Sequence, residues 1–188
     1  MMQRRVWVIR YSVAVLLLII AQLLHADFPG DSIYLLQSEW RTQDAEKIYL
    51  SDLAGKKLVL SMTYTSCQHT CPTIVSNMQA IENNLPETDR DNVRFVLVSL
   101  MPQSDTPEVL KTYANKRGLK GWTLLSGHED DVRMLAMVLD IKYKAVANNE
   151  IAHSNLITIL DDQGRIVRQI NGAESNPSLM AGHLLHQN

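Results

Sequence analysis

The chain has 188 residues, of which 46% are apolar and 20% charged, enough for one globular domain with a core of its own. Three of its 18 basic residues and none of its 20 acidic residues lie in residues 1–26, so the remainder is mildly acidic, with 15 bases against 20 acids. A mildly acidic domain without a basic stripe is not expected to bind nucleic acid.

The first predicted element is a targeting segment at residues 1–26. Arginines precede an apolar run of about 12 residues, at 13–24, which is short of the roughly 20 that span a membrane. We therefore expect a cleaved signal peptide, with an uncleaved N-terminal membrane anchor as the alternative. In either case the domain at residues 27–188 is expected to be exported, to the periplasm or to the periplasmic face of the inner membrane. Contact with a membrane is expected only through the N-terminus, if it is uncleaved.

The first half of the domain is expected to lead from a strand directly into a helix. Residues 27–47 are expected to form an extended segment, followed by a short strand at 48–50. The apolar run at 58–64 predicts a buried strand. Residues 72–85 predict a helix, because Pro72 suits a first helical turn and apolar residues then recur at helical spacing.

Between that strand and that helix lie Cys67 and Cys71, the only cysteines of the chain. A thiol at a helix N-terminus faces exposed amides and the positive end of the helix dipole, which stabilise the thiolate. The thiolate is both the nucleophile of disulfide exchange and a soft ligand that copper(I) prefers. A disulfide between the two would close a very short ring and constrain the unfolded chain little, which favours a reversible, redox-active disulfide over a structural one. The position thus indicates redox chemistry, metal binding or both.

The second half of the chain alternates strand and helix signals. Apolar runs predict strands at 93–100, 123–125, 155–160 and 166–170, and helical spacing predicts helices from Thr106-Pro107 to Gly118, at 130–139 and at 179–185. The last two strands flank a turn and are expected to form a hairpin. This order predicts an α/β fold with a central mixed sheet flanked by helices. Its strands are parallel where helices cross over and antiparallel at the terminal hairpin.

A cysteine pair where a strand feeds a helix is the thioredoxin-like plan, and three sequence blocks narrow it further. The segment YTSCQHTCP at 64–72 resembles the cysteine signature of the Sco/SenC family. The block at 98–110 is similar to the second signature of that family, and IAHS at 151–154 resembles its third, a histidine-serine pair before a strand. The resemblance covers about residues 34–172, with the three blocks in the family's order.

The resemblance implies a copper site. Sco/SenC proteins are exported, thioredoxin-like, copper-binding proteins, and the matching positions are Cys67 and Cys71 as thiolate ligands and His153 as the third ligand of one copper per domain. Two thiolates and one imidazole make a soft site with few ligands, which suits three-coordinate copper(I) and can hold copper(II), whereas zinc usually takes a fourth ligand. Met101 precedes Pro102, where many members of the family carry an acidic residue. Met101 either has no contact with the metal or contacts it through its thioether.

Other histidines and methionines are expected to have ordinary roles. His69, between the cysteines, is expected to face solvent. Surface positions are expected for His128, His183 and His186. Core packing is expected for Met78, Met134 and Met137.

The resemblance implies a metallochaperone rather than an enzyme. The expected function is delivery of copper to a respiratory copper enzyme, above all the dinuclear copper centre of cytochrome c oxidase. The expected partners are therefore an acceptor subunit of such an enzyme and a copper donor protein. The first alternative is a thiol–disulfide oxidoreductase acting on cysteines of a copper acceptor, and the second is a thiol peroxidase. The C-x-x-x-C spacing, and the lack of any proline between Pro107 and Pro177, count against an ordinary thioredoxin-like reductase.

Overall fold

The computed structural model describes residues 28–67, 71–146, 151–172 and 176–185. The predicted targeting segment at residues 1–26 lies outside these ranges and stays a prediction. Within the described ranges, no helix is both long enough and apolar enough to cross a membrane.

Seven strands form one mixed sheet in the order β2-β1-β5-β4-β3-β8-β9. They are β1 (Glu39–Thr42), β2 (Lys47–Tyr49), β3 (Lys57–Thr63), β4 (Val93–Ser99), β5 (Thr123–Ser126), β8 (Leu156–Leu160) and β9 (Ile166–Asn171). Strand β4 runs parallel to both β3 and β5, whereas the other neighbouring pairs of this sheet are antiparallel. The predicted mixed sheet, with its antiparallel terminal hairpin, is therefore confirmed.

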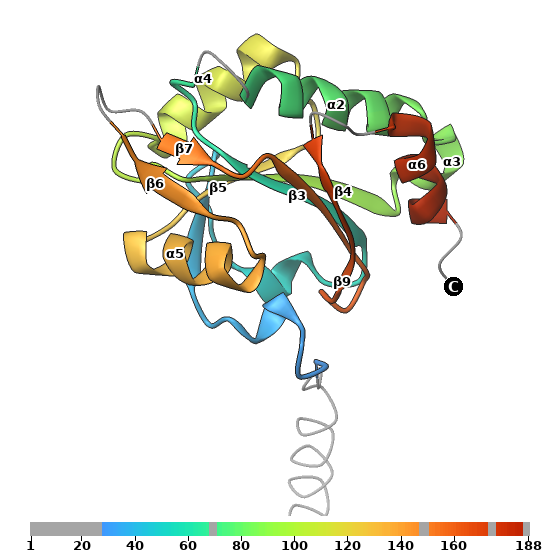
Figure 1. Ribbon diagram of the computed structural model, residues 1–188, viewed down its shortest axis with the longest axis horizontal. Helices are drawn as coiled ribbons and strands as arrows, with labels where there is room; N and C mark the ends of the chain where they lie inside the picture. The colour runs from blue at the N-terminus through green and yellow to red at the C-terminus, as the bar shows by residue number, and fades with distance from the viewer. Residues whose placement is uncertain (1–27, 68–70, 147–150, 173–175, 186–188) are drawn as a thin grey trace, which may run out of the picture.

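Helices cover both faces of this sheet. The helices are α2 (Cys71–Asn83), α3 (Glu87–Arg90), α4 (Pro107–Arg117), α5 (Glu129–Val138) and α6 (Pro177–Leu185), with 3-10 turns η1 (Ile33–Leu35) and η2 (Leu50–Leu53). Helices α2, α4 and α6 contribute to one buried cluster, and α5 with η1 and η2 contributes to another on the opposite face (Figure 1). The sheet is thus the middle layer of three.

The alternation of side chains along the central strands produces this two-sided core. On β3, Val59 packs toward α2, whereas its neighbours Leu58 and Leu60 pack toward α5. On β4, Phe95 and Val96 divide between the two faces in the same way. Successive residues of a strand point to opposite faces, so parallel central strands covered by helices on both sides are continuously apolar.

Local sequence signals set the helix ends. The Thr106 hydroxyl accepts a hydrogen bond from the Val109 amide, Pro107 occupies the first turn of α4, and Gly118 follows the last turn with a φ of 68°. A left-handed residue at that point is the usual way to end a helix, and glycine adopts it without steric cost. These signals explain why the predicted bounds of α4 agree with the structure.

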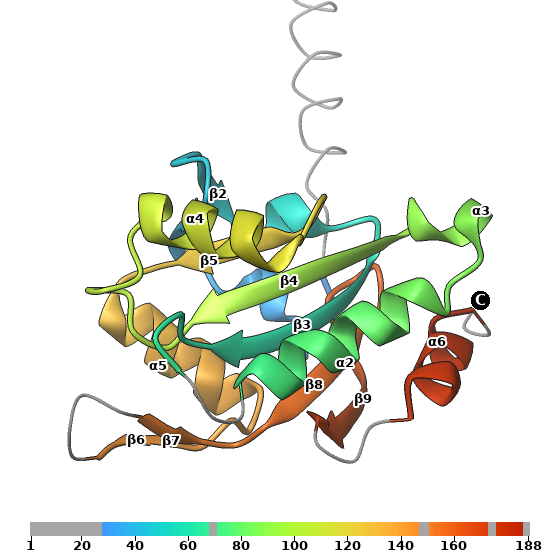
Figure 2. The same cartoon turned by 90° about the horizontal axis from the view of Figure 1, so that it is seen from above.

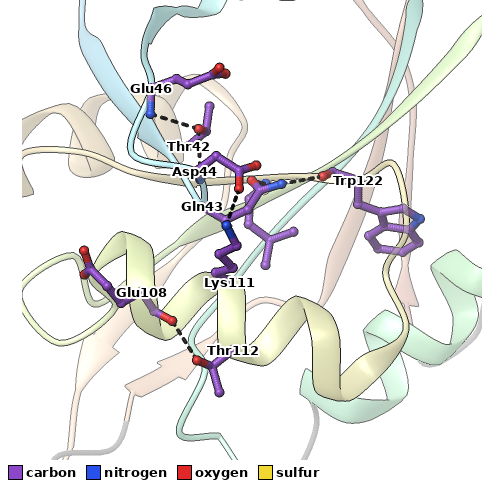
Figure 3. Close-up of polar contacts among 9 residues, drawn as sticks. Thr42, Gln43, Asp44, Glu46, Glu108, Lys111, Thr112 and Trp122 are labelled. Carbon is purple, nitrogen blue, oxygen red and sulfur yellow. Dashed lines mark hydrogen bonds and ion pairs between the residues drawn. The ribbon is translucent and has the colours of Figure 1, made fainter.

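Strand β1 is missed by the prediction of an extended segment at 27–47. It pairs with β2 and with β5, and side chains after it hold it in place (Figure 3). The side-chain amide of Gln43 donates a hydrogen bond to the Trp122 carbonyl at 3.0 Å. The Asp44 carboxylate lies 3.0 Å from the Lys111 ammonium on α4. These partners are distant in sequence, so no local pattern reveals them.

The loops that follow β3 and β4 lie at one edge of the sheet, because parallel strands carry their carboxyl ends to the same edge. The Leu100 amide donates to the Thr63 carbonyl at 2.7 Å, which joins the two loops. A small antiparallel hairpin of β6 (Tyr143–Ala145) and β7 (Ile151–His153) lies at this same end of the molecule (Figure 2). The fold thus brings three separate segments together where the cysteines lie.

Candidate metal centre

The two cysteines line a small buried cluster beyond the end of β3. Cys67 is 8% exposed and Cys71, the first residue of α2, is fully buried. Neither is in a disulfide. They pack with Tyr64, and the half-buried side chains of Met101 and Ile151 lie against the three. The pair is therefore in its reduced form, in a largely apolar setting.

His153 reaches this cluster from β7, 82 residues beyond Cys71. Its Nε2 lies 3.3 Å from the Cys71 Sγ, and its Nδ1 lies 3.0 Å from the Ser154 carbonyl. A carbonyl only accepts, so the Nδ1–H donates to it, and the lone pair of the neutral ring is left on Nε2, facing the thiol. This is the orientation that a metal-ligating imidazole takes, with its other nitrogen fixed by a hydrogen bond.

Burial governs the ionisation of both groups. It raises the pKa of the Cys71 thiol from 9.0 to about 12, with a hydrogen bond to Cys67 as the next cause. It lowers the pKa of His153, against a smaller opposite effect of the Ser154 carbonyl. At neutral pH the metal-free protein therefore has a protonated Cys71 and a neutral His153. The expectation that the helix N-terminus stabilises a thiolate is wrong for metal-free Cys71, because desolvation outweighs the dipole.

Tyr64 ties the β6–β7 hairpin to the cysteine loop. Its hydroxyl accepts a hydrogen bond from the Ile151 amide at 3.3 Å, two residues before His153. Its ring also meets the imidazole edge-to-face, with centroids 6.0 Å apart. Tyr64 is part of the motif that carries the family resemblance, but the motif alone does not reveal that this side chain orients the hairpin.

Asp105 ties the loop after β4 to the loop after β3. It is 2% exposed, and its carboxylate accepts from the Thr65 amide at 3.1 Å, the Thr65 hydroxyl at 2.5 Å and the Ser99 hydroxyl at 2.6 Å. A buried carboxylate is stable only when it is hydrogen-bonded in this way. Sequence reasoning missed this role; the signal was the position of Asp105 in the second family-like block.

The remaining predicted residues lie elsewhere. His69 and His186 fall outside the described residues. His128 is exposed, as predicted, whereas His183 is half-buried in α6. Met78 is fully buried in the core, as predicted. The same prediction is wrong for Met134 and Met137, which are exposed on α5.

In the metal-free protein, some of the side chains that could bind a soft metal ion are already in contact. Cys71 contacts both Cys67 and His153. Across the described ranges, however, no three histidine, cysteine or acidic side chains already form a complete ligand cluster. Thiolate and imidazole donors are those that copper prefers, and the apolar wall disfavours hard, hydrated ions. The site therefore has the donor chemistry for copper, with a final adjustment of the ligands left to binding.

Comparison with known proteins identifies the family of this chain. The sequence model of the SCO1/SenC family matches residues 36–186. A SCO1 protein homolog of Bacillus subtilis is 24% identical over 143 residues, covering 73% of this chain and 74% of that protein. A SCO2-like protein of Rickettsia typhi is 27% identical over 132 residues, covering 67% of this chain and 64% of that protein.

Solved structures share the fold. Bradyrhizobium japonicum ScoI with copper bound superimposes with a TM-score of 0.69 at 24% identity, covering 79% of this chain and 95% of that one. Yeast Sco1 with copper bound gives a TM-score of 0.68 at 17% identity, covering 79% and 85%. The predicted thioredoxin-like fold is thereby confirmed. Since the family model spans nearly all of the described chain, this chain belongs to the SCO1/SenC family.

Proposed function

We propose that this chain is an exported copper-binding assembly factor, which binds one copper through Cys67, Cys71 and His153 and passes it to a respiratory copper enzyme. The observation that carries the proposal is the 3.3 Å contact between the Cys71 Sγ and the His153 Nε2 beside a second reduced cysteine. Family membership supports it, since relatives of this fold have been solved with copper bound.

The ligand set suits copper(I) that is to be handed on. A site with two thiolates and one imidazole leaves copper(I) three-coordinate, which satisfies it without a closed cage. Cys67 lies in the loop after β3, Cys71 is the first residue of α2 and His153 lies on β7. These three proposed ligands lie outside the two core clusters, so an acceptor would not need to unfold the core to reach them. Oxidation of Cys67 and Cys71 to a disulfide would remove both thiolates and release the metal.

The acceptor that we propose is the dinuclear copper centre of cytochrome c oxidase, as the family resemblance implies. A copper donor protein would load the site. The alternative function, thiol–disulfide exchange on cysteines of the acceptor, needs Cys67 and Cys71 but not the imidazole. No contact of the described residues favours it over copper transfer.

A first experiment tests the three-ligand site. Competition with a chromophoric chelator should give one copper(I) per reduced domain. The variants Cys67→Ala, Cys71→Ala and His153→Ala should each weaken copper(I) binding more than about tenfold, or about 1.4 kcal/mol. His128→Ala, an exposed histidine on another element, should retain wild-type affinity. Wild-type affinity in His153→Ala would rule out the three-ligand site.

A second experiment separates copper transfer from disulfide exchange. In cells given limiting copper, His153→Ala should fail to support the copper enzyme while leaving thiol exchange largely intact, because only copper binding uses the imidazole. The measurement is the copper content of the acceptor. If this variant fully supports the copper enzyme, the proposal of copper transfer is wrong and the oxidoreductase function takes its place.

A further inference from the structure

We propose that the Met101 thioether is a fourth, weak ligand to the copper of this chain, and that it biases the site toward copper(I). The inference rests on the proposed function, since it concerns the same site. It adds a residue outside the three family-like ligands.

The position of the Met101 side chain is the first reason. It is half-buried and packs against the cluster of Tyr64, Cys67 and Cys71. Ile151 is the other half-buried apolar side chain against this cluster, and it has no donor atom. Of these two side chains, Met101 is therefore the one that brings a possible metal donor, its thioether, to the cluster that contains both thiols.

The backbone of Met101 is fixed, which is the second reason. Its amide donates to the Ser99 hydroxyl at 2.9 Å, and its carbonyl accepts from the amides of Ser104 and Asp105 at 3.0 and 2.9 Å. Ser99 and Asp105 belong to the network that also holds Thr65, two residues before Cys67. The loop that bears Met101 and the loop that bears Cys67 are thus locked to each other. A ligand on a fixed backbone loses little entropy when it binds metal.

The chemistry of the thioether is the third reason. It is soft and neutral, and it needs no deprotonation before it binds. Two thiolates around copper(I) already leave one net negative charge, which a carboxylate at position 101 would increase and a thioether does not. Weak thioether ligation is known to tune the potential of copper sites. A thioether at Met101 should therefore stabilise copper(I) more than copper(II) and raise the potential of the couple.

The test compares wild-type protein with Met101→Leu, which conserves volume and removes sulfur. Copper(I) affinity should fall about tenfold in the variant, while copper(II) affinity changes less than about threefold. A tenfold loss confined to copper(I) lowers the potential of a one-electron couple by about 59 mV. Met137→Leu, which changes an exposed methionine on α5, is the matched control and should leave affinity and potential at the wild-type values.

A direct measurement does not depend on the stability of the variant. In protein grown with selenomethionine, X-ray absorption at the selenium edge should detect copper beside one selenium. That signal should persist in Met137→Leu and disappear in Met101→Leu. Absence of the signal in wild-type protein that holds copper(I), or wild-type copper(I) affinity in Met101→Leu, would overturn the inference and leave the proposed function standing. Failure of wild-type protein to bind copper(I) at all would overturn both.

Discussion

At Cys71, two physical effects oppose each other, and burial is the stronger. The first residue of α2 faces the positive end of the helix dipole, an effect of about 0.3–1 kcal/mol at exposed sites. Complete removal from water raises the pKa of the thiol to about 12 in spite of it. A metal ion that binds here must therefore displace a proton, so binding is expected to release protons.

The first prediction is that Cys71 resists ionisation in the folded, reduced, metal-free protein. Its raised pKa favours the folded state below the ordinary value of 9.0, and this contribution is lost as pH rises toward about 12. Ultraviolet thiolate absorbance should show one thiol still protonated between these values, whereas in urea both thiols ionise near the ordinary value. Ionisation of both thiols of the folded protein near pH 9 would contradict the burial argument.

Asp105 is the residue whose loss should disturb the site most without removing a ligand. Its buried carboxylate accepts two hydrogen bonds from Thr65, in the loop after β3, and one from Ser99, at the end of β4. An amide of the same shape keeps one oxygen but turns an N–H₂ group toward these donors. Asp44, an exposed acid paired with Lys111 on α4, is the matched control.

The second prediction is that Asp105→Asn lowers the free energy of unfolding by about 2–3 kcal/mol, the range for hydrogen bonds to a charged group. Asp44→Asn should cost less than about 1 kcal/mol. Urea unfolding of the metal-free proteins gives both values. Equal losses in the two variants would mean that the network around Asp105 contributes nothing beyond a surface ion pair.

At the scale of elements, helices were predictable where local chemistry marks their ends. Pro72 and the Thr106-Pro107 pair each begin a helix within one residue of the predicted position. Strand β1 and the β6–β7 hairpin were not predicted, because each strand is only three or four residues long and gives too short an alternating pattern to detect. Element bounds follow from local signals, whereas pairing depends on tertiary contacts.

The same distinction applies to the candidate site. The motif resemblance identified Cys67, Cys71 and His153 from sequence, and the structure brings Cys71 into contact with the other two. The roles of Tyr64 and Asp105 could not be read from the sequence, since they depend on which backbone amides the fold places beside them. The direction of the Cys71 pKa depends on burial, which a local pattern does not give.

The third prediction concerns the β6–β7 hairpin as a carrier of His153. Tyr64→Phe removes the acceptor for the Ile151 amide, at a cost of about 1 kcal/mol in the placement of the hairpin. Copper(I) affinity should fall about fivefold, with little change in the unfolding midpoint. Tyr49→Phe, at a half-exposed position on β2, should alter neither quantity. Chelator competition with the wild-type protein and the two variants measures the copper(I) affinities. Wild-type affinity in Tyr64→Phe would show that the hairpin does not need the hydrogen bond to the Tyr64 hydroxyl.

At the scale of the whole molecule, one apolar cluster packs on each face of the sheet. The residues of these clusters are spread along the described chain, from Phe28 to Leu185. The candidate site lies outside both clusters, at the edge where the loops converge. The fold should therefore tolerate changes of ligand residues, and it should not need the N-terminal segment.

The fourth prediction is that residues 28–188 fold as an independent unit. Thermal unfolding of this fragment should be cooperative, and its copper(I) affinity should equal that of the full chain, because residues within it form a buried cluster on each face of the sheet. Circular dichroism and chelator competition provide the measurements. A fragment that unfolds without a transition would show that the first residues belong to the domain.

The separation of 82 residues between Cys71 and His153 has a consequence for biogenesis. A chain that has completed only its first three strands and helix α2 already contains both thiols, but His153 is not yet in place beside them. The third donor of the proposed copper site arrives only when β7 docks, so tight copper binding would require completed folding. Immature copies would hold their cargo weakly and lose it to any competing scavenger. If the chain delivers copper as proposed, only fully folded molecules would deliver it, and this selection would require no additional component.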